Sequence, residues 1–290
     1  MTTMNFIDIS SWQTGLVLET MFRDNLDLDG VIVKVSQGTG YVNPQAALWI
    51  PWLRQHAKPF GTYHYMDGSG AKAEAQHYAE SLRPFPGGVP ALDYEDTVLS
   101  RGTGYLKECL DEFTRLTGVK PLVYCSQSVT QAQDFAAIAA AGYELWVAQY
   151  ADYKTVNGFV ETPWQRGSVA PFRGYVMHQY TSCGRLKGWG SNLDFDQFCG
   201  TPEDWAALAG SEQPPEEELQ GPDCVVVSEV LMGKYGNGSE RAARLRAAGY
   251  DPQAVQKKIN ELYGIAGKIR PLIGDNMEYL NSIMKIVRDL

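Results

Sequence analysis

Short apolar runs alternate with longer amphipathic stretches over the first two thirds of the chain. The runs are rich in β-branched and aromatic residues, which is typical of buried strands. Eight of them are found, at residues 6–9, 30–36, 60–66, 91–95, 122–125, 145–150, 175–181 and 193–198. Apolar residues at helical spacing indicate helices between the earlier runs, at residues 44–56, 70–83, 103–117 and 127–140.

Strands that alternate with helices predict an α/β fold with parallel strands, and eight such strands favour a closed barrel. The connections after residue 140 lack clear helices and are rich in Gly, Pro and aromatic residues. We therefore expect an irregular second half of the barrel, and a barrel domain over residues 1–209.

The pattern changes after this barrel, where a polar, proline-containing stretch predicts an extended linker over residues 210–222. The net charge changes as well, because residues 222–290 hold 10 basic and 8 acidic side chains and residues 1–221 hold 15 and 26. Such a change indicates two modules with different tasks.

Residues 223–264 have the pattern of a small all-helical module. We expect its helices to begin at Asp223, Ser239 and Asp251, because these residue types accept hydrogen bonds from the free amides of a first turn. Residues 265–290 predict one more helix, whose apolar stripe could pack on the module or allow self-association into a homo-oligomer. The stripe consists of Ile273, Met277, Leu280, Met284 and Val287.

The chain carries 25 Lys and Arg against 34 Asp and Glu residues, a net charge of −9, which argues against a nucleic-acid partner. No apolar run reaches the length of a membrane span, so we expect no membrane insertion. The first residues lack the basic and apolar regions of a secretory signal, so synthesis is expected in the cytoplasm. The five cysteines form no C-x-x-C pair and are expected to be mostly free thiols.

Two carboxylates close the run V-P-A-L-D-Y-E-D at residues 89–96. Side chains at i and i+2 of a strand point to the same side, so Asp93 and Glu95 should share one face. Like charges this close raise the pKa of one carboxyl and keep it protonated near neutral pH. A protonated acid beside a carboxylate can cleave a glycosidic bond, although a lone pair of this kind is more often a strand end with solvated acids.

Polar and aromatic side chains lie near the predicted carboxyl end of nearly every strand, and in a parallel barrel these ends open at one mouth. Aromatic rings stack on the C–H faces of sugars, while sugar edges take hydrogen bonds. The acidic residues are therefore catalytic candidates, and the others are expected to bind substrate. His64, by contrast, is expected to bind a backbone group. The candidates are Asp8, Lys34, Tyr63, Tyr65, Asp93, Glu95, Tyr124, Trp146, Gln179 and Asp194.

Eight segments occur in the order found in glycoside hydrolase family 25 lysozymes, the muramidases of phages and bacteria. They are I-D-I-S-S-W-Q, V-I-V-K-V-S-Q-G-T-G-Y-V-N-P, G-T-Y-H-Y, A-L-D-Y-E, L-V-Y-C-S, L-W-V-A-Q-Y, H-Q-Y-T and L-D-F-D-Q-F. The chain resembles this family from about residue 5 to residue 198. The resemblance implies an incomplete barrel of eight strands and about five helices, and no metal or other cofactor is expected.

The resemblance also implies an acidic quartet at Asp8, Asp93, Glu95 and Asp194. Glu95 would be the proton donor, and Asp93 would orient or polarise the substrate's 2-acetamido group, or act more directly. Asp8 and Asp194 would hold this pair and the incoming water or sugar. The family's commoner V-D-x-N-x-F is replaced by L-D-F-D-Q-F, so Asp196 stands where an asparagine is usual.

The second module resembles the type-7 cell-wall-binding repeat of phage lysozymes. The resemblance is carried by G-K-Y-G-N-G-S-E-R and L-R-A-A-G-Y-D-P-Q-A-V-Q-K-K-I-N-E-L. It implies that a single repeat binds the muropeptide of bacterial peptidoglycan. Arg244 could pair with a carboxylate of this muropeptide.

These features predict a phage-type endolysin that lyses bacterial walls by cutting the β-1,4 bond between N-acetylmuramic acid and N-acetylglucosamine. It would be made in the host cytoplasm and reach the wall after release, or be added from outside. The i, i+2 spacing leaves open whether the reaction retains or inverts the anomeric configuration.

Two other classes of protein fit the sequence less well. A wall-binding protein with an inactive barrel would lack Asp93 or Glu95, and both are present. An amidase or peptidase of the same wall needs a zinc cluster or a Cys–His pair, and the four histidines form no H-E-x-x-H.

Overall fold

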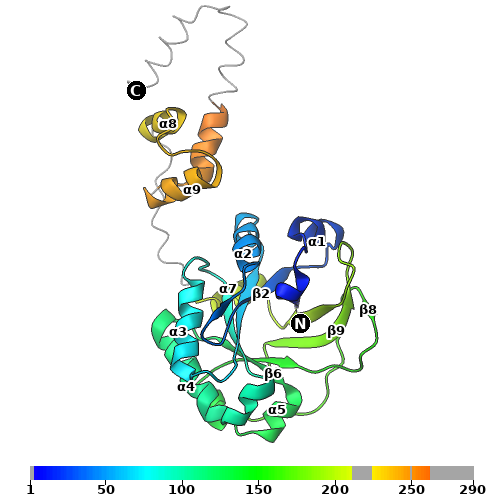
Figure 1. The fold of residues 1–290 in the computed structure, drawn as a ribbon. Helices are drawn as coiled ribbons and strands as arrows, with labels where there is room; N and C mark the ends of the chain where they lie inside the picture. The colour runs from blue at the N-terminus through cyan, green and yellow to red at the C-terminus, as the bar shows by residue number, and fades with distance from the viewer. Residues whose placement is uncertain (1–2, 211–223, 249, 262–290) are drawn as a thin grey trace, which may run out of the picture. The chain divides into compact units, whose positions relative to one another are not determined.

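The computed structural model describes residues 3–210, 224–248 and 250–261 (Figure 1). The chain divides into two compact units, Met1–Ser211 and Glu212–Leu290. The first unit is a closed barrel of eight strands surrounded by helices, and the described part of the second is helical. The fold class predicted from the sequence is confirmed.

The eight barrel strands follow one another around the ring in chain order, and β1 closes the ring by pairing with both β2 and β10. Two further strands, β3 (Tyr41–Val42) and β8 (Val156–Asn157), are short and pair with β2 and β9. The barrel strands are β1 (Met4–Ile9), β2 (Gly30–Gln37), β4 (Phe60–Tyr65), β5 (Val89–Asp93), β6 (Leu122–Ser126), β7 (Leu145–Ala148), β9 (Met177–Arg185) and β10 (Leu193–Phe198).

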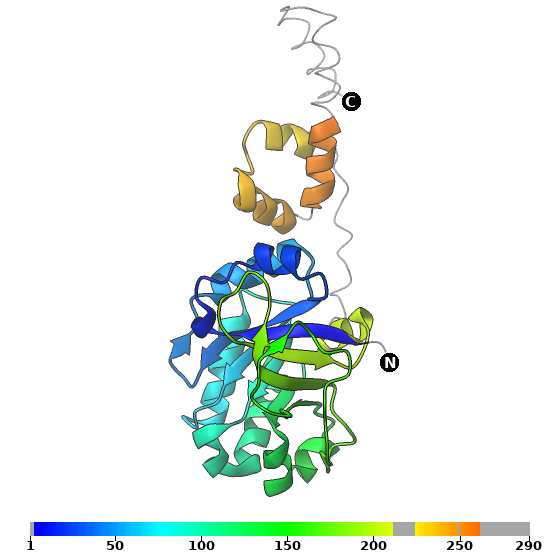
Figure 2. The ribbon, with the colours of Figure 1, turned by 90° about the vertical axis from the view of Figure 1, so that its right-hand side faces the viewer.

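The direction of β10 differs from the prediction. All neighbouring barrel strands from β1 to β9 are parallel, whereas β10 is antiparallel to both β9 and β1. Only residues 186–192 connect β9 to β10, and a parallel pair needs a crossover of about a dozen residues or more. Figure 2 shows the resulting yellow-green hairpin beside the dark-blue β1.

Seven α-helices are found in the described part of the first unit. The prediction of a single helix over residues 127–140 is wrong, because the backbone is extended at Gln133. Its side chain accepts from the Tyr94 hydroxyl at 2.8 Å. In the turn before the next helix, whose N-cap is Phe135, the Asp134 carboxylate accepts from the Ala136 amide at 2.9 Å. The helices are α1 (Leu18–Asp24), α2 (Ala46–Gln55), α3 (Ala71–Leu82), α4 (Gly102–Thr117), α5 (Gln127–Ala132), α6 (Ala136–Ala140) and α7 (Pro202–Leu208).

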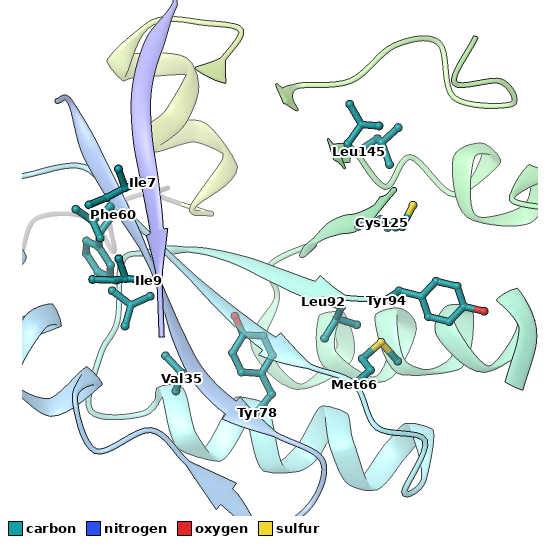
Figure 3. Close-up of a cluster of buried hydrophobic side chains, with 14 of the residues drawn as sticks. Ile7, Ile9, Val35, Phe60, Met66, Tyr78, Leu92, Tyr94, Cys125 and Leu145 are labelled. Carbon is teal, nitrogen blue, oxygen red and sulfur yellow. The ribbon is translucent and has the colours of Figure 1, made fainter. Parts of the chain in front are cut away.

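Side chains alternate between the barrel interior and the outer layer along each strand. On β1, Phe6 belongs to the interior cluster, whereas Ile7 and Ile9 belong to the cluster under the helices, part of which Figure 3 shows. Interior positions are apolar toward the end of the barrel where Trp205 of α7 packs on Phe6. They become polar toward the opposite end, and this gradient creates the site described below.

The second unit has a small core of its own. Its described helices are α8 (Cys224–Leu231), α9 (Gly238–Ala247) and a helix over residues 252–261. No described helix of the chain is both long and apolar enough to cross a membrane. The buried core residues are Val226, Val227, Val230, Leu245, Val255 and Ile259.

Two of the predicted helix starts in this unit can be compared with the structure. Asp251 caps the third helix, since its Oδ1 accepts from the Gln253 amide at 2.8 Å. The predicted N-cap at Ser239 is two residues late, because Asn237 is the N-cap of α9 and the helix begins at Gly238. The predicted start at Asp223, the linker after Gly210 and the helix over residues 265–290 lie outside the described residues.

Candidate active site

A pocket of about 530 Å³ lies at the carboxyl end of the parallel strands. The strand residues that line it include Tyr124 and Trp146, which also belong to the interior cluster of the barrel. All ten candidate residues line this pocket, so the structure brings them together: Asp8, Lys34, Tyr63, Tyr65, Asp93, Glu95, Tyr124, Trp146, Gln179 and Asp194.

Two of these residues line the pocket from positions in their elements that the sequence pattern did not predict. Asp194 lies near the start of its strand, not at the carboxyl end, and it pairs with Asp8 because β10 is antiparallel. Strand β5 ends at Asp93, and Glu95 is the N-cap of a 3-10 helix over Asp96–Arg101. Glu95 keeps an extended backbone (φ −146°, ψ 177°), so the alternation continues and it faces the pocket with Asp93.

An amide and two tyrosines hold Asp8. The Gln179 side chain donates from Nε2 to Asp8 Oδ2 at 2.6 Å. Its Oε1 accepts from the hydroxyls of Tyr124 at 2.8 Å and Tyr150 at 2.5 Å. Because two hydroxyl donors occupy the amide oxygen, the amide nitrogen must face Asp8. The carboxylate form of Asp8 therefore has a fixed donor.

Burial raises the pKa of each acidic residue in the pocket, and repulsion from neighbouring carboxylates adds to this rise for Asp8, Asp93 and Glu95. Burial is the largest cause for all four, and it raises the pKa of Asp194 to about 6. The charge of Asp194 adds to the raised pKa of Asp8, and the charges of Asp96 and Asp194 add to that of Glu95. The four carboxyl groups therefore retain at least one proton close to neutral pH.

Lys34 is the only basic residue among those lining the pocket. Its Nζ donates to Gln37 Oε1 at 2.8 Å and lies 4.4 Å from the centre of the Tyr65 ring. Its positive charge lowers the pKa of both Asp93 and Glu95 and so offsets part of the rise caused by burial. Lys34 thus favours a negative charge on one member of this pair without neutralising the whole group.

The model of the glycosyl hydrolases family 25 matches residues 7–189 of this chain, and a CW_7 repeat matches residues 225–263. The chain belongs to glycosyl hydrolase family 25. It is therefore a glycosidase, and the recognition of both modules from their sequence segments is confirmed.

Known lysozymes resemble this family 25 chain in sequence and in fold. The lysozyme of Streptococcus phage Cp-7 is 27% identical over 271 residues, which cover 89% of this chain and 69% of that protein. A bacterial lysozyme from Streptomyces coelicolor superimposes with a TM-score of 0.58 at 19% identity, over 72% of this chain and 98% of that chain. The catalytic domain of endolysin ply40, from bacteriophage P40 of Listeria monocytogenes, gives 0.57 at 24% identity over the same shares. At these identities the two structures establish the shared barrel alone.

The family 25 pocket also contains residues that the sequence analysis did not select, notably Trp12, Tyr150 and Trp189. Trp12 is 89% exposed, and the 3-10 turn that carries it is fixed by a capping box between Ser10 and Gln13. Trp12 and Tyr150 lie within segments that carried the family resemblance, so the segments pointed to them. Trp189 lies in the loop between β9 and β10, where no periodic pattern indicates a site.

The environment of His64 differs from the prediction, because its ring binds side chains and not a backbone group. Nδ1 is 2.8 Å from Ser36 Oγ and Nε2 is 3.2 Å from Glu74 Oε2, with all three residues buried. His64 lies on the outward face of β4, where α3 brings Glu74 against it, and it does not line the pocket. Among the described residues, no group of three or more His, Cys, Asp or Glu side chains could hold a metal ion.

Proposed function

We propose that this peptidoglycan hydrolase of family 25 cleaves the β-1,4 bond between N-acetylmuramic acid and N-acetylglucosamine, with Glu95 as the proton donor. The observation that carries the proposal is the group of four carboxyls with raised pKa around one pocket. A glycosidic oxygen leaves readily only when it is protonated, so the site needs an acid that keeps its proton near neutral pH.

The surroundings of the four carboxyls support Glu95 as this acid. Asp8 and Asp93 are buried, whereas Glu95 and Asp194 are half-buried. Glu95 has the longer side chain and follows β5 directly, which favours its reach toward a bound sugar. Asp93 would orient or polarise the 2-acetamido group, or act more directly. Asp8 and Asp194 would hold this pair and the incoming water or sugar.

The aromatic residues of the pocket would share the binding of the glycan. Tyr124 and Trp146 are only 8% and 2% exposed. We therefore assign these two rings to the floor of the pocket and not to a surface that stacks on sugars. Tyr63 and Tyr65 are half-buried and leave part of their rings open to the pocket. We assign sugar stacking to these two rings and hydrogen bonding to Lys34.

Glu95→Gln tests the assignment of the acid. The variant keeps the size of the side chain but cannot donate the proton, so turnover should fall by about 10²–10⁴-fold. Glu80→Gln is a matched control, because Glu80 is exposed on α3 and does not line the pocket. Solubilisation of purified peptidoglycan measures both variants, and full activity of Glu95→Gln in a folded protein would refute the assignment.

The CW_7 repeat is proposed to bind the muropeptide through α9. Arg244 is exposed on this helix. Arg244→Ala should weaken binding to intact walls in a pull-down and leave the turnover of soluble fragments nearly unchanged. Arg246→Ala removes the same charge from an exposed position of the same helix and serves as the control. If wild type and Arg244→Ala bind walls equally, this proposal is wrong.

Two further parts of the proposal concern the whole protein. As an endolysin, the protein would be made in the host cytoplasm and would act on the wall after release, or it would be added from outside.

The apolar stripe of residues 273–287 could also join two copies of the chain. Light scattering of the full-length and 1–272 chains decides this, because self-association through the stripe requires a larger species in the full-length sample only.

A further inference from the structure

Asp196 is a buried carboxyl group beneath the acidic pocket, on β10 two residues after Asp194. Its side chain has 0% exposure, and it does not line the pocket. The Trp146 indole donates from Nε1 to Asp196 Oδ1 at 2.8 Å. Within the described residues, Asp196 Oδ2 is buried and receives no hydrogen bond from a donor. A carboxylate oxygen in this position would lose its hydration without compensation.

Asp8 is a diagonal neighbour of Asp196 across the β1–β10 pair, because Asp8 pairs with Asp194 and Phe6 pairs with Asp196. Both side chains face the barrel interior, since Asp8 lines the pocket and Asp196 accepts from the interior residue Trp146. Strand β10 runs between β1 and β9, and Asp196 pairs in register with Phe6 and Gln179. Two ionised carboxylates on diagonal neighbours repel strongly in a buried site, and one proton between them can turn the repulsion into a hydrogen bond. A proton on Asp196 Oδ2 therefore gives both groups a partner.

The surroundings decide which of the two holds the proton. Asp8 accepts a short hydrogen bond of 2.6 Å from the Gln179 amide and lines the pocket. Asp196 is fully enclosed and accepts only from a neutral indole. The negative charge is thus better stabilised on Asp8.

Resting on the proposed function, we infer that Asp196 is a positioning residue that remains protonated and donates its proton to Asp8. Asp8 then keeps its charge and its orientation in the pocket. An asparagine, which is usual here in the family that the sequence resembles, would offer the same donor through its amide. Burial first, and then the charges of Asp8 and Asp194, raise the pKa of Asp196 in agreement with this role. Tyr150 and Tyr180 are further titratable groups within electrostatic range of Asp196.

Infrared spectroscopy of the full-length chain tests the protonation without substrate. The wild type minus Asp196→Asn difference spectrum at neutral pH should contain the band of a protonated carboxyl. The presence of only a carboxylate band in that difference would overturn the inference. Because this measurement needs no turnover, its outcome does not depend on the proposed function.

Turnover measurements test the positioning role. Asp196→Asn should keep kcat within about threefold of the wild type, because the amide retains a donor toward Asp8. Asp196→Leu removes the donor and keeps the same number and branching of side-chain heavy atoms, and it should lower kcat by roughly 10–100-fold with little change in KM. A folded Asp196→Asn that loses as much activity as Asp196→Leu would overturn the inference.

These measurements distinguish a failure of the inference on Asp196 from an unfolded variant and from a failure of the proposed function. If Asp196→Leu does not fold, the Asp196→Asn kinetics and the infrared spectrum still decide the question. If the wild type itself releases no glycan fragments, the proposed function fails, while the infrared result still tests whether Asp196 is protonated.

Discussion

At the scale of single residues, the acidic pocket opposes folding at neutral pH. Asp8, Asp93, Glu95 and Asp194 all have a raised pKa in the folded barrel. A carboxyl of this kind binds its proton more tightly in the folded than in the unfolded chain. The free energy of unfolding therefore falls as the pH rises from the unfolded pKa toward the folded one.

Asp194→Asn should recover the part of the free energy of unfolding that ionisation of Asp194 removes. The pKa of Asp194 is about 6, against about 3.9 in an unfolded chain. Above about pH 6, the variant should gain roughly 1–3 kcal/mol in free energy of unfolding, because it has no carboxyl to ionise. The gain should shrink as the pH falls and vanish below about pH 4, where Asp194 is protonated in both states.

Denaturant unfolding of the two proteins across this pH range measures the effect. Asp27→Asn, at an exposed position outside the pocket, is the control. A gain for Asp194→Asn that is the same at all pH values would contradict the account.

At the scale of elements, Glu74 of α3 fixes the loop that follows β4. Its carboxylate accepts from the amides of Asp67 and Gly68, both at 3.0 Å, from His64 and from the Tyr105 hydroxyl. Burial raises the pKa of Glu74, but the hydrogen bonds from His64 and Tyr105 outweigh it and lower the pKa. The ionised side chain therefore joins β4, α3 and α4 behind the strand that carries Tyr63 and Tyr65.

Glu74→Ala should be strongly destabilising, because it leaves several donors at a buried position without their acceptor. We expect the free energy of unfolding to fall by about 3–5 kcal/mol. Urea unfolding measures this loss. Glu80→Ala, at an exposed position of the same helix, should change the free energy by less than about 0.5 kcal/mol. Similar losses for the two variants would show that the network around Glu74 contributes little.

Much of the site could be predicted from the sequence, because the strand alternation places Asp93 and Glu95 on one face and family segments mark the other positions. The position of Asp194 beside Asp8 could not be predicted in this way. It depends on the antiparallel direction of β10, which the short connection over residues 186–192 imposes. The diagonal position of Asp196 beside Asp8 depends on the same register and gives no signal in the local pattern of residues.

At the scale of the whole molecule, the two units have separate cores and match separate families over residues 7–189 and 225–263. We propose that residues 1–209 form the catalytic domain and that the linker spans residues 210–222. The truncated chain 1–209 should then fold and hydrolyse soluble glycan fragments at nearly the full-length rate, but clear intact walls more slowly. Limited proteolysis of the full-length chain should cut first between Ser211 and Pro222. An insoluble or inactive 1–209 chain would show that the second unit is needed for the barrel.

The central claim, that Glu95 protonates the leaving oxygen between muramic acid and glucosamine, is tested most directly by the chemistry of the products. Purified peptidoglycan is digested with the wild type and with Glu95→Gln, and the products are reduced with borohydride before mass spectrometry. The account predicts new reducing ends on muramic acid in the wild-type digest, no new free amino groups, and no such products from Glu95→Gln beyond background. Reduced glucosamine ends, newly exposed amino groups, or an unchanged product yield from Glu95→Gln would contradict it.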